Sequence, residues 1–188
     1  MQRRKKAIRR TAREARRSLS AEERRDASAR IAATVVHSHF FRRSRRIACY
    51  LPMPEEVDTW PIIERAWRMK KRIFAPMLAP ERLLRFREVR PDTTLVTTGF
   101  GLQEPVYGDE ITARQLDLVI TPLVAFDMEA NRIGMAGGYY DRTFSFLRGR
   151  KSLLRPKLVG VAFACQEAEK IPLNPWDIGL YRVITERS

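Results

Sequence analysis

The pattern of apolar and polar positions changes character near residue 45. Residues 3–17 are helix formers that carry only a narrow apolar stripe. The next stretch begins at Ser20, and Glu23 follows three positions later, which is the spacing of a capping box. We therefore predict two helices in this part, the second ending near His39.

After residue 45, short apolar runs alternate with stretches that have helical spacing. Runs that are apolar throughout predict strands buried on both faces, as in a mostly parallel sheet covered by helices. The run at 82–89 alternates in part, which is typical of an antiparallel or edge strand. The predicted strands are 46–53, 72–78, 82–89, 116–127, 157–165 and 181–186, with a helix at 60–70.

These elements predict an α/β fold, with a three-layer α/β/α arrangement around a mostly parallel central sheet. A chain of 188 residues with 44% apolar and 31% charged residues has the balance of one globular domain. We expect a single domain over residues 1–188, with basic N-terminal helices at 3–40. In such sheets, ligands bind outside the carboxyl ends of the strands.

The two cysteines, Cys49 and Cys165, each lie inside an apolar run. We expect both to be buried small hydrophobes and to form neither a disulfide nor a metal site. No run reaches the ~18 apolar residues that a membrane span needs, and the arginine-rich start is not followed by the apolar segment of a secretion signal. We therefore expect a cytoplasmic protein without a membrane partner.

The formal charge is +14, and its excess is concentrated at one end. Residues 1–50 hold 16 lysines and arginines against 4 acids, a net +12, which leaves +2 for residues 51–188. Such a segment could bind nucleic acid, or it could be a solvated helix that also supplies cations to a phosphorylated ligand. Because aromatic residues are not interleaved with these cations, we do not expect a nucleic-acid partner.

The stretch "NRIGMAGGYYDRTF" at 131–144 follows the apolar run 116–127. Glycines before a helix allow backbone amides to approach phosphate oxygens, and the helix N-terminus adds partial positive charge. The stretch is neither a P-loop nor the dinucleotide fingerprint. A tight turn would explain the glycines without any ligand.

Asp141 favours the phosphate alternative, because we expect it in the first turn of the following helix. A carboxylate beside phosphates requires a hard cation between them, and Mg²⁺ binds through one or two carboxylates plus phosphate oxygens. Arg132 and Arg142 could balance the remaining charge. Tyr139 and Tyr140 suit a planar heterocycle, although helical tyrosines are more often part of a core.

The same stretch resembles the signature of the 5-formyltetrahydrofolate cyclo-ligase family, also called 5,10-methenyltetrahydrofolate synthetase. The resemblance extends over nearly the whole chain, in the order "KKAIR", "SAEERRDAS", "YLPMPEEVDT", "GLQEP", "DLVITPLVAFD", "VGVAFACQ", "IP" and "VITE". It implies ATP and Mg²⁺ as cofactors, 5-formyltetrahydrofolate as the substrate and, as we expect, a monomer.

The resemblance also implies roles for the matching positions. Lys5 and Arg9, four residues apart on one helix face, would hold ATP phosphates, and Asp141 and Asp177 would bind magnesium. We expect Arg132, Tyr140 and Asp141 to carry catalysis. The nucleotide loop would comprise Arg132, Ile133, Gly134, Met135, Ala136, Gly137, Gly138, Tyr139 and Tyr140. The folate would contact Leu51, Met53, Glu56, Met135, Ala136, Gly137, Gly138 and Tyr139.

Three positions depart from the family pattern. Ala136 stands where glycine is usual, which adds a methyl group where the backbone must pass close to a ligand. Trp176 replaces a frequent histidine and Tyr181 a frequent aspartate, which weakens the assignment of Asp177 to the metal. From the bare sequence, Glu56 would be a solvated acid.

The implied reaction is the ATP-dependent closure of 5-formyltetrahydrofolate to 5,10-methenyltetrahydrofolate, through phosphorylation of the formyl oxygen and attack by N10. Phosphoryl transfer requires mainly positioning and electrostatic stabilisation, so no histidine is needed, and we take His37 and His39 as structural. Two alternatives remain open: a basic nucleic-acid-binding protein, and a folate or nucleotide binder on the same scaffold without turnover.

Overall fold

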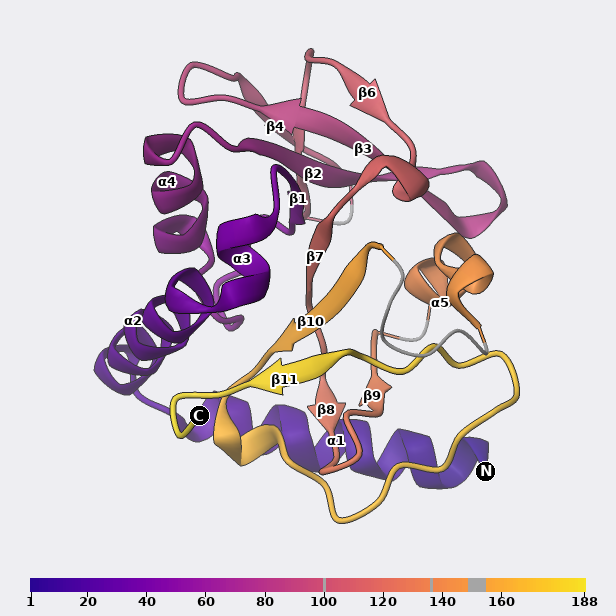
Figure 1. The fold of residues 1–188 in the computed structure, drawn as a ribbon. Coiled ribbons are helices and arrows are strands. Elements are labelled where there is room, and N and C mark those ends of the chain that lie inside the picture. The colour runs from indigo at the N-terminus through magenta and orange to yellow at the C-terminus, as the bar shows by residue number, and fades with distance from the viewer. Residues whose placement is uncertain (100, 136, 149–154) are drawn as a thin grey trace.

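The computed structural model describes residues 1–99, 101–135, 137–148 and 155–188, so the prediction about Ala136 lies outside the described residues. Its main feature is a seven-stranded sheet in the order β11-β10-β7-β1-β2-β3-β6 (Figure 1). The strands of this sheet are β1 Arg46–Cys49, β2 Arg72–Ala79, β3 Leu83–Val89, β6 Glu110–Ile111, β7 Leu118–Thr121, β10 Lys157–Val161 and β11 Arg182–Ile184.

The five strands from β11 to β2 pair in parallel, which confirms the mostly parallel sheet. The alternating pattern of β3 predicted an antiparallel or edge strand; β3 is antiparallel to β2 and is not an edge strand, because β6 pairs beyond it. Two small antiparallel pairs complete the strands: β4 Leu95–Thr97 with β5 Gln103–Pro105, and β8 Ala125–Phe126 with β9 Arg132–Ile133.

The first strand is shorter than the predicted 46–53, because it ends at Cys49. Beyond it, the backbone oxygen of Tyr50 accepts a hydrogen bond from the Thr59 hydroxyl at 2.7 Å, and the Tyr50 hydroxyl donates to the Val57 oxygen at 3.0 Å. These bonds fold residues 50–59 into a loop at the carboxyl end of the sheet.

The N-terminal part forms three helices. Both bonds of the predicted capping box are present, since Ser20 N donates to Glu23 at 2.7 Å and Glu23 N to the Ser20 hydroxyl at 3.1 Å. The second helix ends before His39 because Ser38 caps a new helix. The α-helices are α1 Gln2–Ser18, α2 Ala21–His37, α3 His39–Arg43, α4 Trp60–Arg68 and α5 Tyr139–Thr143; the 3₁₀ turns are η1 Pro80–Arg82, η2 Ala113–Gln115, η3 Ser145–Leu147 and η4 Ala164–Gln166.

Helices cover both faces of the sheet. On one face, α2 and α4 bury Ile31, Val35 and Ile62 against strand residues in the largest core cluster. On the other face, α5 and the turns beside it bury Phe144 against Phe86, with ring centroids 6.0 Å apart. This arrangement agrees with the predicted layers.

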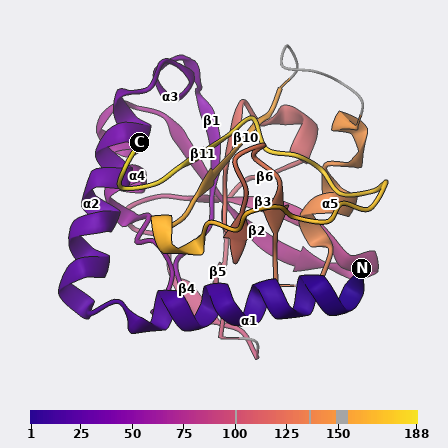
Figure 2. The same cartoon turned by 90° about the horizontal axis from the view of Figure 1, so that it is seen from below.

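Helix α1 lies outside these layers. Figures 1 and 2 show it running across the end of the molecule where β8 and β9 lie. Ala12 of α1 packs against Val124, Ala125 and Ile133 in a small apolar cluster of its own. The most basic helix of the chain is therefore held against the carboxyl ends of the parallel strands.

The cysteine prediction was half right. Cys49 is fully buried in β1, but Cys165 is exposed because it lies in the turn η4 that follows β10 and not in the strand. Among the described residues, none of the helices has the length and apolar content to cross a bilayer.

Candidate active site

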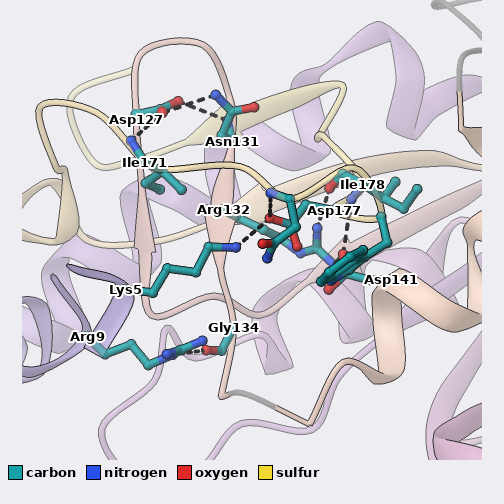
Figure 3. A network of polar contacts seen from close by, with 12 residues as sticks. Lys5, Arg9, Asp127, Asn131, Arg132, Gly134, Asp141, Ile171, Asp177 and Ile178 are labelled. Atoms are coloured by element: carbon teal, nitrogen blue, oxygen red, sulfur yellow. Dashed lines mark hydrogen bonds and ion pairs between the residues drawn. The ribbon is translucent and has the colours of Figure 1, made fainter. Parts of the chain in front are cut away.

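The glycine stretch follows the short β8–β9 hairpin, which lies at the carboxyl edge of the sheet. Between β8 and β9, the buried Asp127 carboxylate accepts hydrogen bonds from the backbone N–H of Glu129 at 3.1 Å and of Asn131 at 3.0 Å. Its other oxygen accepts from the Asn131 side chain at 3.1 Å and from Ile171 N at 3.0 Å (Figure 3). These four hydrogen bonds to one carboxylate fix the conformation of the turn at 127–131, from which the chain continues into the glycine loop.

The glycine loop opens α5 as predicted. Gly138 has a φ of +70°, which favours glycine, and it stands at the N-cap of α5, so Asp141 lies in the first turn. Gly134 has no such conformational need, and a Cβ built on it would meet no atom of the described residues within 4 Å. Neither local conformation nor packing against the described residues therefore requires glycine at this position.

Three basic residues of α1 reach the carboxyl edge. The Lys5 ammonium forms an ion pair with the Asp177 carboxylate, and the two side chains are only 8% and 14% exposed. Arg9 Nε donates to the Gly134 backbone oxygen at 2.8 Å, and Arg13 donates to the Met135 sulfur at 3.1 Å. Figure 3 shows Lys5 and Arg9 pointing from α1 toward these partners.

Arg132 connects the glycine loop to the C-terminal segment. One of its terminal nitrogens donates to the Ile178 backbone oxygen, and the other donates to Asp141 Oδ1 at 3.0 Å. The same Asp141 oxygen accepts from Ile178 N at 3.1 Å, which ties Asp141 to the residue that follows Asp177, the other predicted metal ligand. Arg132 is buried, and both of its terminal nitrogens are engaged.

The charge of Asp177 is held by its surroundings. Burial raises the pKa of this carboxyl, but the Asn174 N–H at 2.8 Å and the Lys5 ammonium outweigh burial and leave the pKa below its ordinary value. The described residues contain no group of three or more His, Cys, Asp or Glu side chains that could hold a metal alone. The bonds that Asp141 accepts from Arg132 and Ile178 N use Oδ1, and those that Asp177 accepts from Lys5 and Asn174 N use Oδ2, which leaves the other oxygen of each carboxylate. Two such oxygens fit a hard cation whose remaining ligands are phosphate oxygens and water.

The loop after β1 forms the second wall of the site. Leu51 is buried, and Met53 and Glu56 are half-buried. The Met53 N–H donates to Glu56 Oε2 at 3.2 Å. Burial raises the pKa of the Glu56 carboxyl despite this bond and the nearby Arg16 cation. The structure thus differs from the solvated acid that the bare sequence favours at this position.

The two walls share one electrostatic environment. Burial raises the pKa of both Tyr50 and Tyr140 well above the ordinary value, and the negative charge of Glu56 adds to each shift. The Arg132 guanidinium opposes the shift of Tyr140, whose ring centroid lies 5.9 Å from it. Tyr140 also stacks on Phe144 at 6.1 Å, so it belongs partly to the core.

Sequence reasoning missed two residues that shape this region. No role was assigned to Asp127 from the sequence, although it ends the motif "DLVITPLVAFD". An aspartate at the end of an apolar run is a turn signal, because its side chain can accept hydrogen bonds from the backbone of the residues that follow. Arg16 of α1 is buried and donates to Glu55 at 3.4 Å, while its Nε has no partner among the described residues. Trp176 and Tyr181, which depart from the family pattern, are both exposed.

Comparisons with known proteins place the chain in a family. The model of the "5-formyltetrahydrofolate cyclo-ligase family" matches residues 1–186. A 5-formyltetrahydrofolate cyclo-ligase of Escherichia coli K12 is 36% identical over 177 residues, which cover 92% of this chain and 95% of that protein. Its counterpart in Haemophilus influenzae is 34% identical over 147 residues, or 76% of each chain.

A solved structure shares the fold over nearly the whole length. The NMR structure of Aquifex aeolicus 5,10-methenyltetrahydrofolate synthetase superposes with a TM-score of 0.83 at 30% identity, covering 98% of this chain and 90% of that one. The order of elements, the glycine loop and the sequence matches all lead to one conclusion. This chain belongs to the 5-formyltetrahydrofolate cyclo-ligase family.

Proposed function

We propose that this chain uses ATP to close 5-formyltetrahydrofolate into 5,10-methenyltetrahydrofolate, with the carboxyl edge of the sheet as its active site. The observation that carries this proposal is the meeting of four sequence-distant segments there. Hydrogen bonds and ion pairs join α1 to the glycine loop, to Asp177 and, through Arg16 and Glu55, to the loop that holds Glu56.

The ATP phosphates would lie against the glycine loop and α1. Lys5 donates one of the three N–H bonds of its ammonium to Asp177, and Arg9 donates its Nε–H to Gly134, so both cations retain donors for phosphate oxygens. The open space over Gly134 leaves the backbone accessible to a ligand. Because Arg132 has both terminal nitrogens engaged, we assign it to holding Asp141 and the 178 segment in position.

Asp141 and Asp177 would hold Mg²⁺ through their unbonded oxygens. When bound, such an ion neutralises charge on the phosphates that are transferred. The chain's own part is to hold both carboxylates in position. The Lys5 ammonium pairs with Asp177, and the Arg132 guanidinium pairs with Asp141.

The folate would occupy the space between Leu51, Met53 and Glu56 on one side and the loop from Met135 to Tyr139 on the other. A half-buried carboxyl such as Glu56 suits the amino and ring N–H groups of a pterin, because it accepts hydrogen bonds where water is scarce. The neighbouring Tyr140 ring adds an apolar surface to this wall.

The reaction then proceeds in two steps whose bonds balance. The formyl oxygen attacks the γ-phosphorus of ATP, the bond to the bridging oxygen breaks, and ADP leaves with that electron pair. N10 next bonds to the activated formyl carbon and loses its proton, and the carbon–oxygen bond breaks to release inorganic phosphate. The chain orients the reactants and stabilises charge, which is how proteins mainly assist phosphoryl transfer.

A spectrophotometric assay tests the proposal. The purified chain is mixed with 5-formyltetrahydrofolate, and the near-ultraviolet absorbance of the methenyl product is followed with ATP and Mg²⁺ together and with each omitted. We expect product only when both are present, and one ADP formed for each product. Binding of either ligand without product would support the alternative of a binder without turnover.

A further inference from the structure

One hollow on the surface of this molecule lies away from the candidate active site. It encloses about 970 Å³, and of its ten lining residues eight are lysine or arginine and one, Asp117, is an acid. We call it the basic hollow. It lies at the amino ends of the parallel strands, where β1, β2, β10 and β11 each begin with a basic residue. These four residues are Arg46, Arg72, Lys157 and Arg182.

Part of this charge is neutralised within the protein. The Asp117 carboxylate accepts from the Arg45 and Arg46 N–H groups, both at 2.9 Å, and pairs with Arg155 at 2.8 Å. Burial raises the pKa of Asp117, but these donors outweigh it and keep the pKa below its ordinary value. Arg72 pairs with Glu88 at 2.8 Å and also reaches Asp109, while Lys71 donates to two backbone oxygens.

Four other cations of the basic hollow are not neutralised by an acid among the described residues. The side chains of Arg42, Arg45, Arg46 and Lys70 are exposed, and within the described part of the chain none of them makes a hydrogen bond or an ion pair. Four like charges around one hollow repel one another and lower the stability of the compact state. Nothing in the folding of the described residues requires them there, so a ligand of opposite charge is their natural counterpart.

Although the sequence alone led us to expect no nucleic-acid partner, this cluster of exposed cations changes that expectation, and we propose that the basic hollow binds the phosphate backbone of a nucleic acid. A site for a single small anion would present buried donors, whereas these cations are exposed on a rim. Adjacent strands lie about 4.8 Å apart, so the basic residues that begin β11, β10, β1 and β2 extend over roughly 20 Å, interrupted only at β7, where Asp117 precedes the strand; this length suits a chain of phosphates. This inference is independent of the proposed function.

Recognition here would be largely independent of sequence. The ring of Tyr181, an exposed aromatic at this end of the sheet, is covered by the Lys157 ammonium 3.9 Å from its centroid. Bases therefore have little surface on which to stack, and contacts would fall on phosphates. The parallel strands are four or five residues long in β1, β7 and β10, which places the basic hollow about 15 Å from the carboxyl edge.

Fluorescence anisotropy with the full chain tests this site. The probe is a labelled single-stranded RNA of mixed sequence, about 16 nucleotides long, titrated at salt concentrations from about 50 to 200 mM. The test variant combines Arg42→Gln, Arg45→Gln and Arg46→Gln. A matched control, Arg3→Gln with Arg4→Gln and Arg10→Gln, removes the same charge from the exposed face of α1.

We expect the test variant to bind RNA at least about 10-fold more weakly at low salt. Its slope of log affinity against log salt should be shallower by about 2, since each phosphate contact on a single strand contributes roughly 0.7. The control should keep most of the affinity, and the test variant should keep its cyclo-ligase activity, which also shows that it folds. Equal losses in both variants, no RNA binding by the native chain, or displacement of RNA by inorganic triphosphate at equal total phosphate would each overturn the proposal.

Discussion

The two ends of the parallel strands use positive charge in opposite ways. At the carboxyl edge, buried cations are paired: Lys5 with Asp177, and Arg132 with Asp141. At the amino edge, four cations of the basic hollow are exposed and have no side-chain partner in the described ranges. The chain therefore carries similar residue types at both edges, in two different states of solvation.

This difference follows from the cost of removing charge from water. A buried ammonium or guanidinium is tolerated only when a carboxylate or carbonyl replaces its lost hydration, so each buried cation also fixes the position of its partner. An exposed cation keeps its water and fixes nothing. The side chains of the carboxyl edge are consequently held in position before a ligand binds. The cations of the amino edge attract anions but are not held in a fixed geometry. Net charge alone does not distinguish these two edges.

The largest effect should come from breaking the carboxyl edge at Asp141. Asp141→Asn keeps the size of the side chain but removes the charge that pairs with Arg132, so we expect kcat to fall at least ~100-fold, the usual range for one charge-stabilising group. Asp26→Asn, on the exposed surface of α2, removes the same charge and should change kcat less than about twofold.

RNA binding at the basic hollow should be the same in both aspartate variants, because Asp141 lies at the other edge. Near-normal turnover of Asp141→Asn, with the thermal unfolding temperature unchanged, would remove Asp141 from the catalytic site. A loss of both turnover and RNA binding would indicate a general disturbance of the fold. It would contradict the proposal that catalysis and RNA binding depend on different edges of the sheet.

Much of the fold could be predicted from the sequence because its signals are local. The continuous apolar runs predicted the parallel strands, partial alternation predicted that 82–89 is antiparallel, and Ser20 with Glu23 predicted the start of α2. The strand predicted at 116–127 is in fact β7 followed by the separate strand β8, since Pro122 lies between them and cannot donate a ladder hydrogen bond.

The membership of the site stays a prediction, and the pairings within it could not be predicted. The resemblance named Lys5, Arg132, Asp141 and Asp177, and the structure pairs Lys5 with Asp177 and Arg132 with Asp141. Which carboxylate pairs with which cation depends on contacts between residues far apart in the chain, such as Lys5 and Asp177, and no local spacing contains that information. The exposure of Cys165 escaped prediction for a related reason, since an apolar run does not reveal where its strand ends.

A smaller effect is expected at Lys5, where the chain offers a matched pair of neighbours. Lys5→Met removes a buried ammonium and leaves Asp177 unpaired, whereas Lys6→Met removes an exposed one. We expect Lys5→Met to raise the KM for ATP about 10-fold and to lower the free energy of unfolding by about 2 kcal/mol, as for a charged hydrogen bond. Lys6→Met should change both quantities little.

Steady-state kinetics at varied ATP and urea denaturation measure the two quantities for the lysine variants. If Lys5 only stabilised the fold, the KM values for ATP and folate would shift together, or neither would shift. If Lys6→Met matched Lys5→Met in its effect on ATP, diffuse attraction by α1 would explain the affinity, and burial would not be the deciding property.

The adjacent acids Glu55 and Glu56 sharpen the comparison on the folate side. Glu56→Gln should weaken folate binding several-fold, with ATP binding nearly unchanged, because Glu56 lies in the wall beside Tyr50 and Tyr140. Glu55→Gln loosens surface pairs with Arg16 and Arg17 and should affect folate less. Calorimetric titration with each ligand separates these outcomes, and equal losses for ATP and folate in Glu56→Gln would place Glu56 elsewhere.

The smallest predicted effect concerns pH, because two carboxyls of the site should respond in opposite directions. Asp177 has a pKa below its ordinary 3.8, held there by Asn174 N–H and Lys5 against burial, so its stabilising contribution is present above pH 3.8 and is lost as pH falls through the folded-state pKa. Burial raises the pKa of Glu56 above its ordinary 4.5, so its contribution is present below pH 4.5 and is lost as pH rises through the folded-state pKa.

Urea denaturation at a series of pH values tests this opposition in Asp177→Asn and Glu56→Gln. The stability difference between the native chain and Asp177→Asn should narrow as pH falls below 3.8. As pH rises above 4.5, Glu56→Gln should gain stability relative to the native chain, because it no longer carries a half-buried charge. Parallel curves for the two variants would mean that both carboxyls are solvated alike, and the carboxyl edge would then lack the buried, paired charges that set it apart from the basic hollow.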